Sequence, residues 1–153
     1  MTPTELVREL IDRYARGDMD GAFELYGDEL VFSDEFGVPN RYEIVGKAAF
    51  GRSMEEWRRV GGTQTRMYQD ISIEDLVIHE TKDPNLVIAE WTYVSRIGEE
   101  TVENRNIIVI GCKDGKIVLS RDYHNYITRA IADGKAAALA QKVASLALPV
   151  DRA

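Results

Sequence analysis

The sequence changes its hydrophobic period once, near Thr63, and this change constrains the fold more than any other feature. Before it, apolar residues recur every three or four positions, which is typical of amphipathic helices. After it, apolar and polar residues alternate in long segments, among them residues 86–97, 101–112 and 116–127, which the short turns "GEE" and "KDG" join. Short turns join antiparallel neighbours, so the sequence predicts an α+β fold with N-terminal helices on a curved antiparallel sheet.

The segments ahead of the period change predict three helices and a short strand. The first helix follows Thr4, in "ELVRELIDRYA"; the second is "MDGAFELYG"; the third is "KAAFGRSMEEWRRVGG", closed by Gly61 and Gly62. "ELVFSDEFG" is the short strand, and "VPNRYEIVG", which contains Pro39, is a loop. A curved sheet that helices close encloses a cone, and cones of this size hold small apolar ligands.

The chain of 153 residues is long enough to bury a real core as one domain. We find no repeat and no linker that would divide it. We therefore expect a single domain over residues 1–153, with a core at about 4–128. The Ala-rich tail at about 129–148 is predicted to be helical.

Charge and cysteine content exclude several classes of partner. With 26 acidic and 19 basic residues, the net charge of -7 argues against a nucleic-acid partner. The single cysteine cannot form a disulfide within the chain, which suits a reducing compartment. The N-terminal stretch is charged where a signal peptide needs an apolar core, and no apolar run is long enough to span a bilayer. We expect a cytoplasmic protein with no membrane partner.

Metal and nucleotide motifs are also missing from the sequence. His79 and His124 lie far apart, with no HxH or HExxH spacing, so we expect no metal site. Neither GxGxxG nor GxxxxGK occurs, so no nucleotide cofactor is predicted.

The last strand, in "KIVLSRDYHNYI", carries the most polar residues. Alternation places Asp122, His124 and Tyr126 on one face, together with Val118 and Ser120 upstream. The other face would carry Ile117, Leu119, Arg121, Tyr123 and Asn125. Neither face is purely apolar, so the face of Asp122 is either a pocket wall, a solvated stripe or a dimer-facing surface. If it points inward, Asp122 and His124 form a proton-transfer couple on one surface.

Two stretches, "IDRYARGDMDGAFELYGDELVFSDEFG" and "NRNIIVIGCKDGKIVLSRDYHNYI", resemble the nuclear transport factor 2-like superfamily. That group includes ketosteroid isomerase, limonene epoxide hydrolase, the SnoaL-type polyketide cyclases and the phenazine-pathway A/B proteins. The resemblance covers about residues 4–128 and implies a single SnoaL-like domain with the cystatin-like α+β barrel and its cone-shaped pocket. It also implies a homodimer through the open sheet face. Because this scaffold hosts enzymes, binding proteins and transport adaptors, the resemblance does not fix the reaction.

The resemblance also implies roles for individual residues. Tyr14 falls where ketosteroid isomerase has its oxyanion-hole tyrosine, and Asp34 falls where that enzyme has its general base. The place of its second acid falls near Arg105, which can bind an oxyanion but cannot imitate a neutral carboxylic acid. The "RDY" motif resembles the SnoaL cyclases and limonene epoxide hydrolase, which makes Asp122 a catalytic acid or base. The epoxide hydrolase also needs an Arg and an Asp two residues apart on an earlier strand. This sequence has Trp91 and Tyr93 near that place, so we do not expect epoxide hydrolysis.

Each of these residues has a structural alternative. Tyr14 fits a core tyrosine, Asp34 fits a turn aspartate that caps its own backbone, and Arg105 fits a solvated strand residue or an ion-pair partner of Asp122. Candidate substrate-binding residues are the apolar and aromatic side chains of the third helix and the strand at 86–97, with one acid in that strand. They are Phe50, Met54, Trp57, Glu90, Trp91 and Tyr93.

Two functions from different classes follow. The first is a cofactor-independent enzyme that isomerises, cyclises or dehydrates a hydrophobic carbonyl metabolite by acid–base chemistry. Asp122 would be the main acid/base with His124 as its partner, Asp34 the second candidate base, and Tyr14 and Arg105 the oxyanion donors. The alternative is a non-catalytic ligand-binding or assembly module, with a closed pocket and Asp122 facing solvent.

Overall fold

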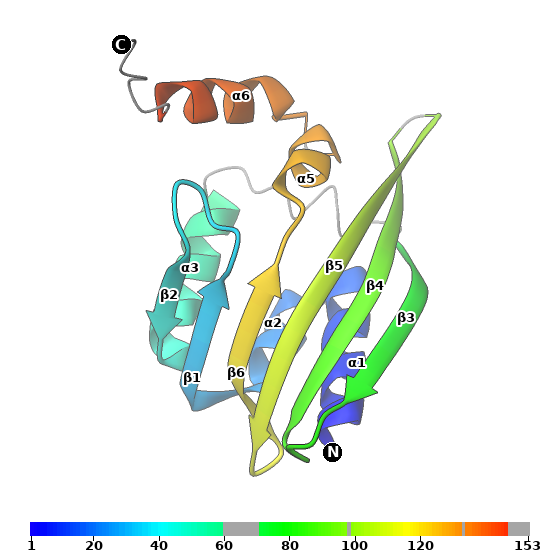
Figure 1. Cartoon of the computed structure of the whole chain (residues 1–153), viewed down its shortest axis with the longest axis vertical. Helices are drawn as coiled ribbons and strands as arrows, with labels where there is room; N and C mark the ends of the chain where they lie inside the picture. The colour runs from blue at the N-terminus through cyan, green and yellow to red at the C-terminus, as the bar shows by residue number, and fades with distance from the viewer. Residues whose placement is uncertain (60–70, 98, 133, 147–153) are drawn as a thin grey trace, which may run out of the picture.

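The computed structural model describes residues 1–59, 71–97, 99–132 and 134–146, and in these residues six strands form one sheet. The strand order is β2-β1-β6-β5-β4-β3 (Figure 1). The strands are β1 (Tyr26–Asp34), β2 (Tyr42–Val45), β3 (Ser72–Glu80), β4 (Leu86–Ile97), β5 (Glu100–Lys113) and β6 (Lys116–Tyr123). Helices α1 (Pro3–Ala15), α2 (Met19–Glu24) and α3 (Lys47–Arg59) lie along one face of the sheet in Figure 1. The predicted α+β fold with a curved sheet is confirmed.

One pair of strands in this sheet is parallel. β1 and β6 run side by side in the same direction, whereas the other neighbouring pairs are antiparallel. The C-terminal ends of β1 and β6 therefore meet at one edge of the sheet. Asp34 is the register partner of Asp122 there, so residues far apart in the sequence become neighbours.

Helix α1 begins at a different residue from the one predicted. Thr2, not Thr4, is the N-cap: its hydroxyl accepts from the Glu5 backbone N–H, and the Glu5 carboxylate accepts from the Thr2 backbone N–H at 2.7 Å. This reciprocal capping box satisfies two backbone donors of the first turn, and Pro3 fits the first helical position because it has no N–H to leave unpaired. The buried face of the helix holds Leu6, Val7, Leu10 and Ile11.

The core between helices and sheet is built around Phe50 of α3. Its ring centroid lies 4.8 Å from that of Phe32 and 5.1 Å from that of Tyr26, and it stacks on Phe23 at 6.4 Å. Cys112 is buried at the end of β5, and burial raises the pKa of its thiol to about 11. The thiol stays protonated at neutral pH, as suits a small strand-end residue.

Strands β1, β2 and β6 differ from the prediction, and β1 begins and ends three residues earlier than the predicted strand. The segment after Pro39, predicted to be a loop, contains β2, which pairs with β1 from Val31 to Asp34. Strand β6 ends at Tyr123, whereas the alternating pattern predicted a strand to Ile127; helix α5 (Tyr126–Ala132) begins there instead. Four residues are too few to separate a strand end from a helix start, because the helical spacing of three to four positions becomes visible only over a longer segment.

A bulge corrects the predicted faces of β6. Gly111 pairs with Leu119 and Cys112 with Ile117, so Val118 is an extra residue in β6. Such a bulge shifts the alternation by one position. Ile117 therefore lies in the core, on the same face as Ser120 and Asp122, and not with Tyr123 as predicted.

The C-terminal part of the described chain consists of α5 and α6 (Ala136–Ser145), which lie beyond the end of β6 in Figure 1. The predicted helix stops at Gly61–Gly62 and Pro149 fall outside the described residues. None of the described helices is long and apolar enough to cross a membrane.

Candidate active site

A cavity of about 560 Å³ opens between the helices and the inner face of the sheet. Its walls are mostly apolar and aromatic, and Phe50, Met54, Trp91 and Tyr93, which were predicted to bind substrate, are among them. Its polar wall residues come mainly from the ends of β1 and β6 and the start of α5. They include Asp34, Tyr42, Asp122, His124 and Tyr126. A large apolar pocket with a few convergent polar groups is the usual form of a small-molecule site.

Asp34, the last residue of β1, is the most buried acid of this cluster, with 2% of its surface exposed. The Tyr126 hydroxyl donates to its Oδ2, and the Tyr42 hydroxyl lies 3.5 Å from the same oxygen. Oδ1 is buried and has no hydrogen-bond partner among the described residues. A buried carboxylate oxygen without a donor is costly, so Asp34 is a candidate functional group in the cavity wall.

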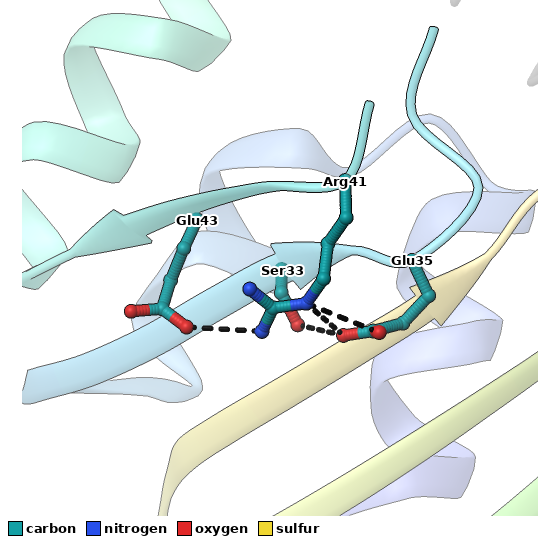
Figure 2. Close-up of polar contacts among 4 residues, drawn as sticks. All are labelled: Ser33, Glu35, Arg41 and Glu43. Atoms are coloured by element: carbon teal, nitrogen blue, oxygen red, sulfur yellow. Dashed lines mark hydrogen bonds and ion pairs between the residues drawn. The ribbon is translucent and has the colours of Figure 1, made fainter. Parts of the chain in front are cut away.

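Polar contacts on the outer side of β1 fix the strand end that carries Asp34. Figure 2 shows Arg41 between two carboxylates: its Nε donates to Glu35 at 3.1 Å and its Nη2 to Glu43 at 3.0 Å. The Ser33 hydroxyl also donates to Glu35, and this bond, followed by Arg41, lowers the pKa of that carboxylate. The Glu35 backbone N–H donates to the Asp122 carbonyl at 2.9 Å. These contacts hold the ends of β1 and β6 together, with Asp34 directed inward.

Asp122 and His124 lie beside Asp34 in the cavity. The Ser120 hydroxyl donates to Asp122 Oδ1 at 2.7 Å, and His124 Nε2 lies 3.4 Å from Asp122 Oδ2. Both side chains are about four-fifths buried, with 16% and 21% of their surface exposed. The structure therefore brings the predicted Asp122–His124 couple to the cavity together with Asp34. Three alternatives were considered for the face that carries Asp122: a pocket wall, a solvated stripe or a dimer-facing surface. In the structure this face is a pocket wall.

Two tyrosine hydroxyls surround Asp34 as proton donors. Burial, followed by the negative charge of Asp34, raises the pKa of Tyr42 to about 12. Burial and the hydrogen bond to Asp34 raise the pKa of Tyr126 still further. Both phenols are therefore neutral donors at physiological pH. The ring of Tyr42 remains partly exposed, and its hydroxyl is the end that reaches the cavity.

The raised pKa of Tyr42 predicts a late step in an alkaline titration. A phenol whose pKa is raised in the folded state stabilises the fold below pH 10, and this contribution is lost as the pH rises from 10 to about 12. We expect Tyr42→Phe to remove an ionisation near pH 12 from the absorbance titration at pH values where circular dichroism still reports native protein. A loss of absorbance change near pH 10 instead would contradict the placement of the hydroxyl beside Asp34.

Tyr14 lies in the cavity wall on the helix side. Its hydroxyl shares a hydrogen bond of 3.1 Å with the Tyr26 hydroxyl. Burial, followed by the proximity of Tyr14, raises the pKa of Tyr26 well above its usual value. Tyr14 thus lies in the cavity wall, and its role as an oxyanion donor stays a prediction.

Trp91 supplies a donor that the sequence analysis treated only as wall. Its ring packs edge-on against Tyr93 at 5.5 Å, and its Nε1 is buried without a hydrogen-bond partner among the described residues. The Tyr93 hydroxyl, in contrast, donates to the Ile11 carbonyl at 3.3 Å. An indole N–H left unsatisfied in a cavity wall is available to a ligand acceptor.

Arg105 and Glu90, predicted to join the site, lie on the opposite face of the sheet. Asn104 and Asn106 are the buried residues of this part of β5, so alternation turns Arg105 outward. Glu90 is also outward and lies 2.7 Å from His79 Nε2. Arg105 and Glu90 line a second cavity of about 630 Å³ instead. Arg105 is therefore not placed to bind an oxyanion beside Asp122, and Glu90 is not placed to contact a substrate in the first cavity, so this part of the predicted site is corrected.

The structure does not test one of the predicted site residues, and it adds two residues to the candidate site. The side chain of Trp57, predicted to bind substrate, lies outside the description, although its backbone belongs to α3. Tyr42 and Tyr126 were not among the predicted site residues. Tyr126 had a signal, because alternation placed it on the face of Asp122. Tyr42 had none, because the strand that carries it was predicted as a loop.

A metal site is not evident in the described residues, where no group of three His, Cys, Asp or Glu side chains is placed to hold an ion. The polar groups of the cavity are carboxylates, phenols, an imidazole and an indole. Such groups accept and donate protons at short range, and carboxylate and imidazole are the usual general acids and bases.

Comparisons with known proteins agree with the fold. The family model of the SnoaL-like domain matches residues 7–120. A candidate isomerase from Bacillus subtilis is 26% identical, with a TM-score of 0.64 over 88% of this chain and 97% of that one. A candidate polyketide cyclase from Pseudomonas putida KT2440 is 23% identical, with a TM-score of 0.58 over 82% and 92% of the two chains.

A protein of Catenulispora acidiphila with a ketosteroid isomerase-like fold is 12% identical, with a TM-score of 0.60 over 88% of this chain and 95% of that one. At such low identity, the likeness shows the fold alone. No curated protein matches the sequence significantly.

Proposed function

The chain belongs to the SnoaL-like domain family, and we propose that it is an enzyme that removes a proton next to a carbonyl group of a hydrophobic small molecule. The observation that carries this proposal is the pair Asp34 and Asp122, side by side on β1 and β6 within an apolar cavity. Such a reaction leads to isomerisation, cyclisation or dehydration, and needs only positioned acids, bases and oxyanion donors.

Asp34 is the better placed of the two carboxylates to act as the base. Its Oδ1 has no donor, whereas the Asp122 oxygens face the Ser120 hydroxyl and His124. We therefore exchange the roles that the sequence suggested. Asp34 Oδ1 takes the α-proton, and the electron pair of the broken C–H bond enters the enolate. The Tyr126 and Tyr42 hydroxyls keep the Asp34 carboxylate oriented.

The enolate oxygen requires donors, and Trp91 Nε1–H and the Tyr14 hydroxyl supply them on the proposed pathway. Donors preorganised in a water-poor site stabilise such an anion more strongly than water does. His124, oriented by Asp122, then delivers a proton. Delivery to another carbon gives an isomer, and delivery to a departing hydroxyl gives water and an alkene. Attack of the enolate carbon on a second carbonyl closes a ring.

Proton exchange tests the proposal without knowledge of the full reaction. Apolar ketones that raise the melting temperature of the protein are selected first, because a ligand that binds the native state stabilises it. Each is then incubated with the protein in D₂O, and α-deuterium is measured by mass spectrometry. Enzyme-dependent exchange supports the proposal. Ligands that bind but never exchange would favour the alternative, a non-catalytic binding module on the same fold.

We further propose that the chain forms a homodimer through the outer face of the sheet. Val77, Glu90, Ile107 and Tyr123 form a row of register partners across β3, β4, β5 and β6 on that face. Val77 and Ile107 are each 46% exposed, and Phe36, which packs edge-on against Tyr123, is 63% exposed. Exposed apolar and aromatic side chains gathered on one face indicate an interaction surface, and Glu90 is the charged residue within this row.

Light scattering after gel filtration is expected to give about twice the chain mass of 17.3 kDa. Ile107→Lys places a charge at the centre of the row and should produce monomers, because an unpaired charge in an interface is costly to desolvate. Val45→Lys is the control, since Val45 is 66% exposed on β2, away from the row. A monomeric wild-type protein would refute the dimer and leave the catalytic proposal untouched.

A further inference from the structure

Three cationic side chains line one end of the cavity. Arg129 comes from α5, Lys135 caps the N-terminus of α6, and Lys142 lies in the last turn of α6. We call these three residues the cationic rim. Figure 1 shows that α5 and α6 lie beyond the ends of β1 and β6, where the carboxylates of the site are found. The cavity therefore has carboxylates on its strand side and cationic side chains on its C-terminal helices.

Arg129 and Lys142 have no carboxylate partner among the described residues, although the chain carries 26 acids and 19 bases. Some other cations of the chain do have such partners: Arg13 pairs with Glu9, Arg41 with Glu35 and Lys113 with Glu29. What sets Arg129 and Lys142 apart from other unpaired cations is their position, because both line the apolar cavity. An acidic group of a bound ligand would supply their counter-charge there.

Arg129 also lies close to the catalytic cluster. Its positive charge opposes the rise in the pKa of both Tyr42 and Tyr126, so its guanidinium is within electrostatic reach of the phenols that hold Asp34. Arg129 is partly buried, whereas Lys142 is exposed at the outer edge of the rim. Arg129 and Asp34 line the same cavity, so one ligand can contact both.

We propose that the cavity takes an amphipathic anion, with an apolar body between α1, α3 and the sheet and an acidic oxygen group held by the cationic rim. The argument rests on the proposed function, since it assumes that the cavity is the ligand site. An Arg guanidinium matches a carboxylate, sulfonate or phosphate with two parallel hydrogen bonds, and Lys142 adds a second charge. The reacting carbonyl of such a ligand lies at Asp34, away from the acidic group.

Two fluorescent probes with the same apolar body distinguish the contribution of the cationic rim to ligand affinity from that of the apolar cavity. 8-Anilinonaphthalene-1-sulfonate carries a sulfonate, and N-phenyl-1-naphthylamine is the neutral parent compound. Both become brighter in an apolar site, so their affinities can be compared directly. The wild type is expected to bind the sulfonate more tightly than the neutral probe, with a preference that falls as NaCl is added, because salt screens exposed charges.

The test variant is Arg129→Gln/Lys142→Gln. We expect about a tenfold loss of affinity for the sulfonate and no change for the neutral probe, because a charge-assisted contact in a partly buried site is worth on the order of 1.4 kcal/mol or more. The control, Arg8→Gln/Lys82→Gln, removes the same charge from exposed positions outside both cavities. Arg129→Lys should retain part of the preference, and unchanged melting temperatures show that each variant is folded.

The possible results distinguish a failure of the cationic rim from a failure of the proposed ligand site. If both double variants lose the same affinity for the sulfonate, the effect comes from net charge, and the proposed role of the cationic rim is refuted. Parallel losses for both probes would assign it to packing and also overturn it. If the wild type binds the neutral probe but shows no preference for the sulfonate, the rim is refuted while the cavity stands. If the neutral probe does not bind at all, the apolar site itself fails and the rim with it.

Discussion

Asp34→Asn is expected to lower enzyme-dependent α-proton exchange by about 10²- to 10⁴-fold, because a general base contributes rate factors of this size. Asparagine has nearly the same shape and still offers an oxygen to the Tyr126 and Tyr42 hydroxyls, but it cannot take a proton from carbon. The rate is measured as deuterium incorporated into a bound ketone per unit time in D₂O. The affinity for the ketone should change little, since the shape of the cavity is kept.

Two further variants decide which carboxylate is the base. Asp122→Asn removes the partner of His124 and is expected to slow the later proton delivery more than the exchange step. Asp28→Asn, at an exposed position of the same strand β1, should leave the exchange rate unchanged. If Asp122→Asn abolished exchange while Asp34→Asn kept it, the base would be Asp122, as the sequence alone suggested. If both variants kept full exchange, acid–base catalysis by this pair would be ruled out.

The fold was predictable because its main signal is long-range and redundant. The period change near Thr63 and the short turns at "GEE" and "KDG" determine three adjacent strands, and β4 and β5 occur within a residue of the predicted limits. The turn at Asp114 and Gly115 also has the backbone that the sequence requires, since both residues have positive φ. Local turn chemistry and hydrophobic period agree here, so the prediction is robust.

The phase of β5 was not predictable, so alternation could not test the place in the site that the resemblance gave to Arg105. The run "NIIVIGC" is apolar at every second position on both faces, so alternation gives no sign of which face is inner. The structure resolves the phase through buried Asn104 and Asn106, which bond to each other: the Asn106 side-chain amide donates to the Asn104 carbonyl at 2.7 Å. A periodicity analysis expects apolar residues on the buried face, so the buried Asn104 and Asn106 make that face look exposed in the sequence.

The closeness of Asp34 to Asp122 had no local signal either. It depends on the parallel pairing of β1 with β6, which joins strands separated by most of the chain. The bulge at Val118 matters as well, because it moves Ile117 into the core while leaving Ser120 and Asp122 inward. Both are tertiary features. The resemblance to known proteins made each of the two acids a candidate, but it left open whether they meet.

Phe50→Ala is expected to destabilise the fold by about 3 kcal/mol, near the lower end of the range for a buried Phe. Phe50 is 2% exposed and packs against the rings of Phe32, Tyr26 and Phe23, so its removal forfeits three aromatic contacts. It also borders the cavity, so the mutation enlarges an existing space instead of opening a new one inside packed atoms. Urea denaturation monitored by circular dichroism measures the loss, which corresponds to a melting temperature lower by roughly 10 °C.

The matched control for this loss is Phe36→Ala. Phe36 is 63% exposed and has one aromatic neighbour, Tyr123, at 5.3 Å, so the same change in side chain should cost less than about 1 kcal/mol. If the outer face of the sheet is a dimer interface, the control becomes concentration-dependent, because dissociation then contributes to unfolding. Phe50→Ala should stay more destabilising at every protein concentration. Equal losses for the two variants would mean that the aromatic cluster at Phe50 does not hold α3 against β1, and the wall of the cavity would then have to be stabilised elsewhere.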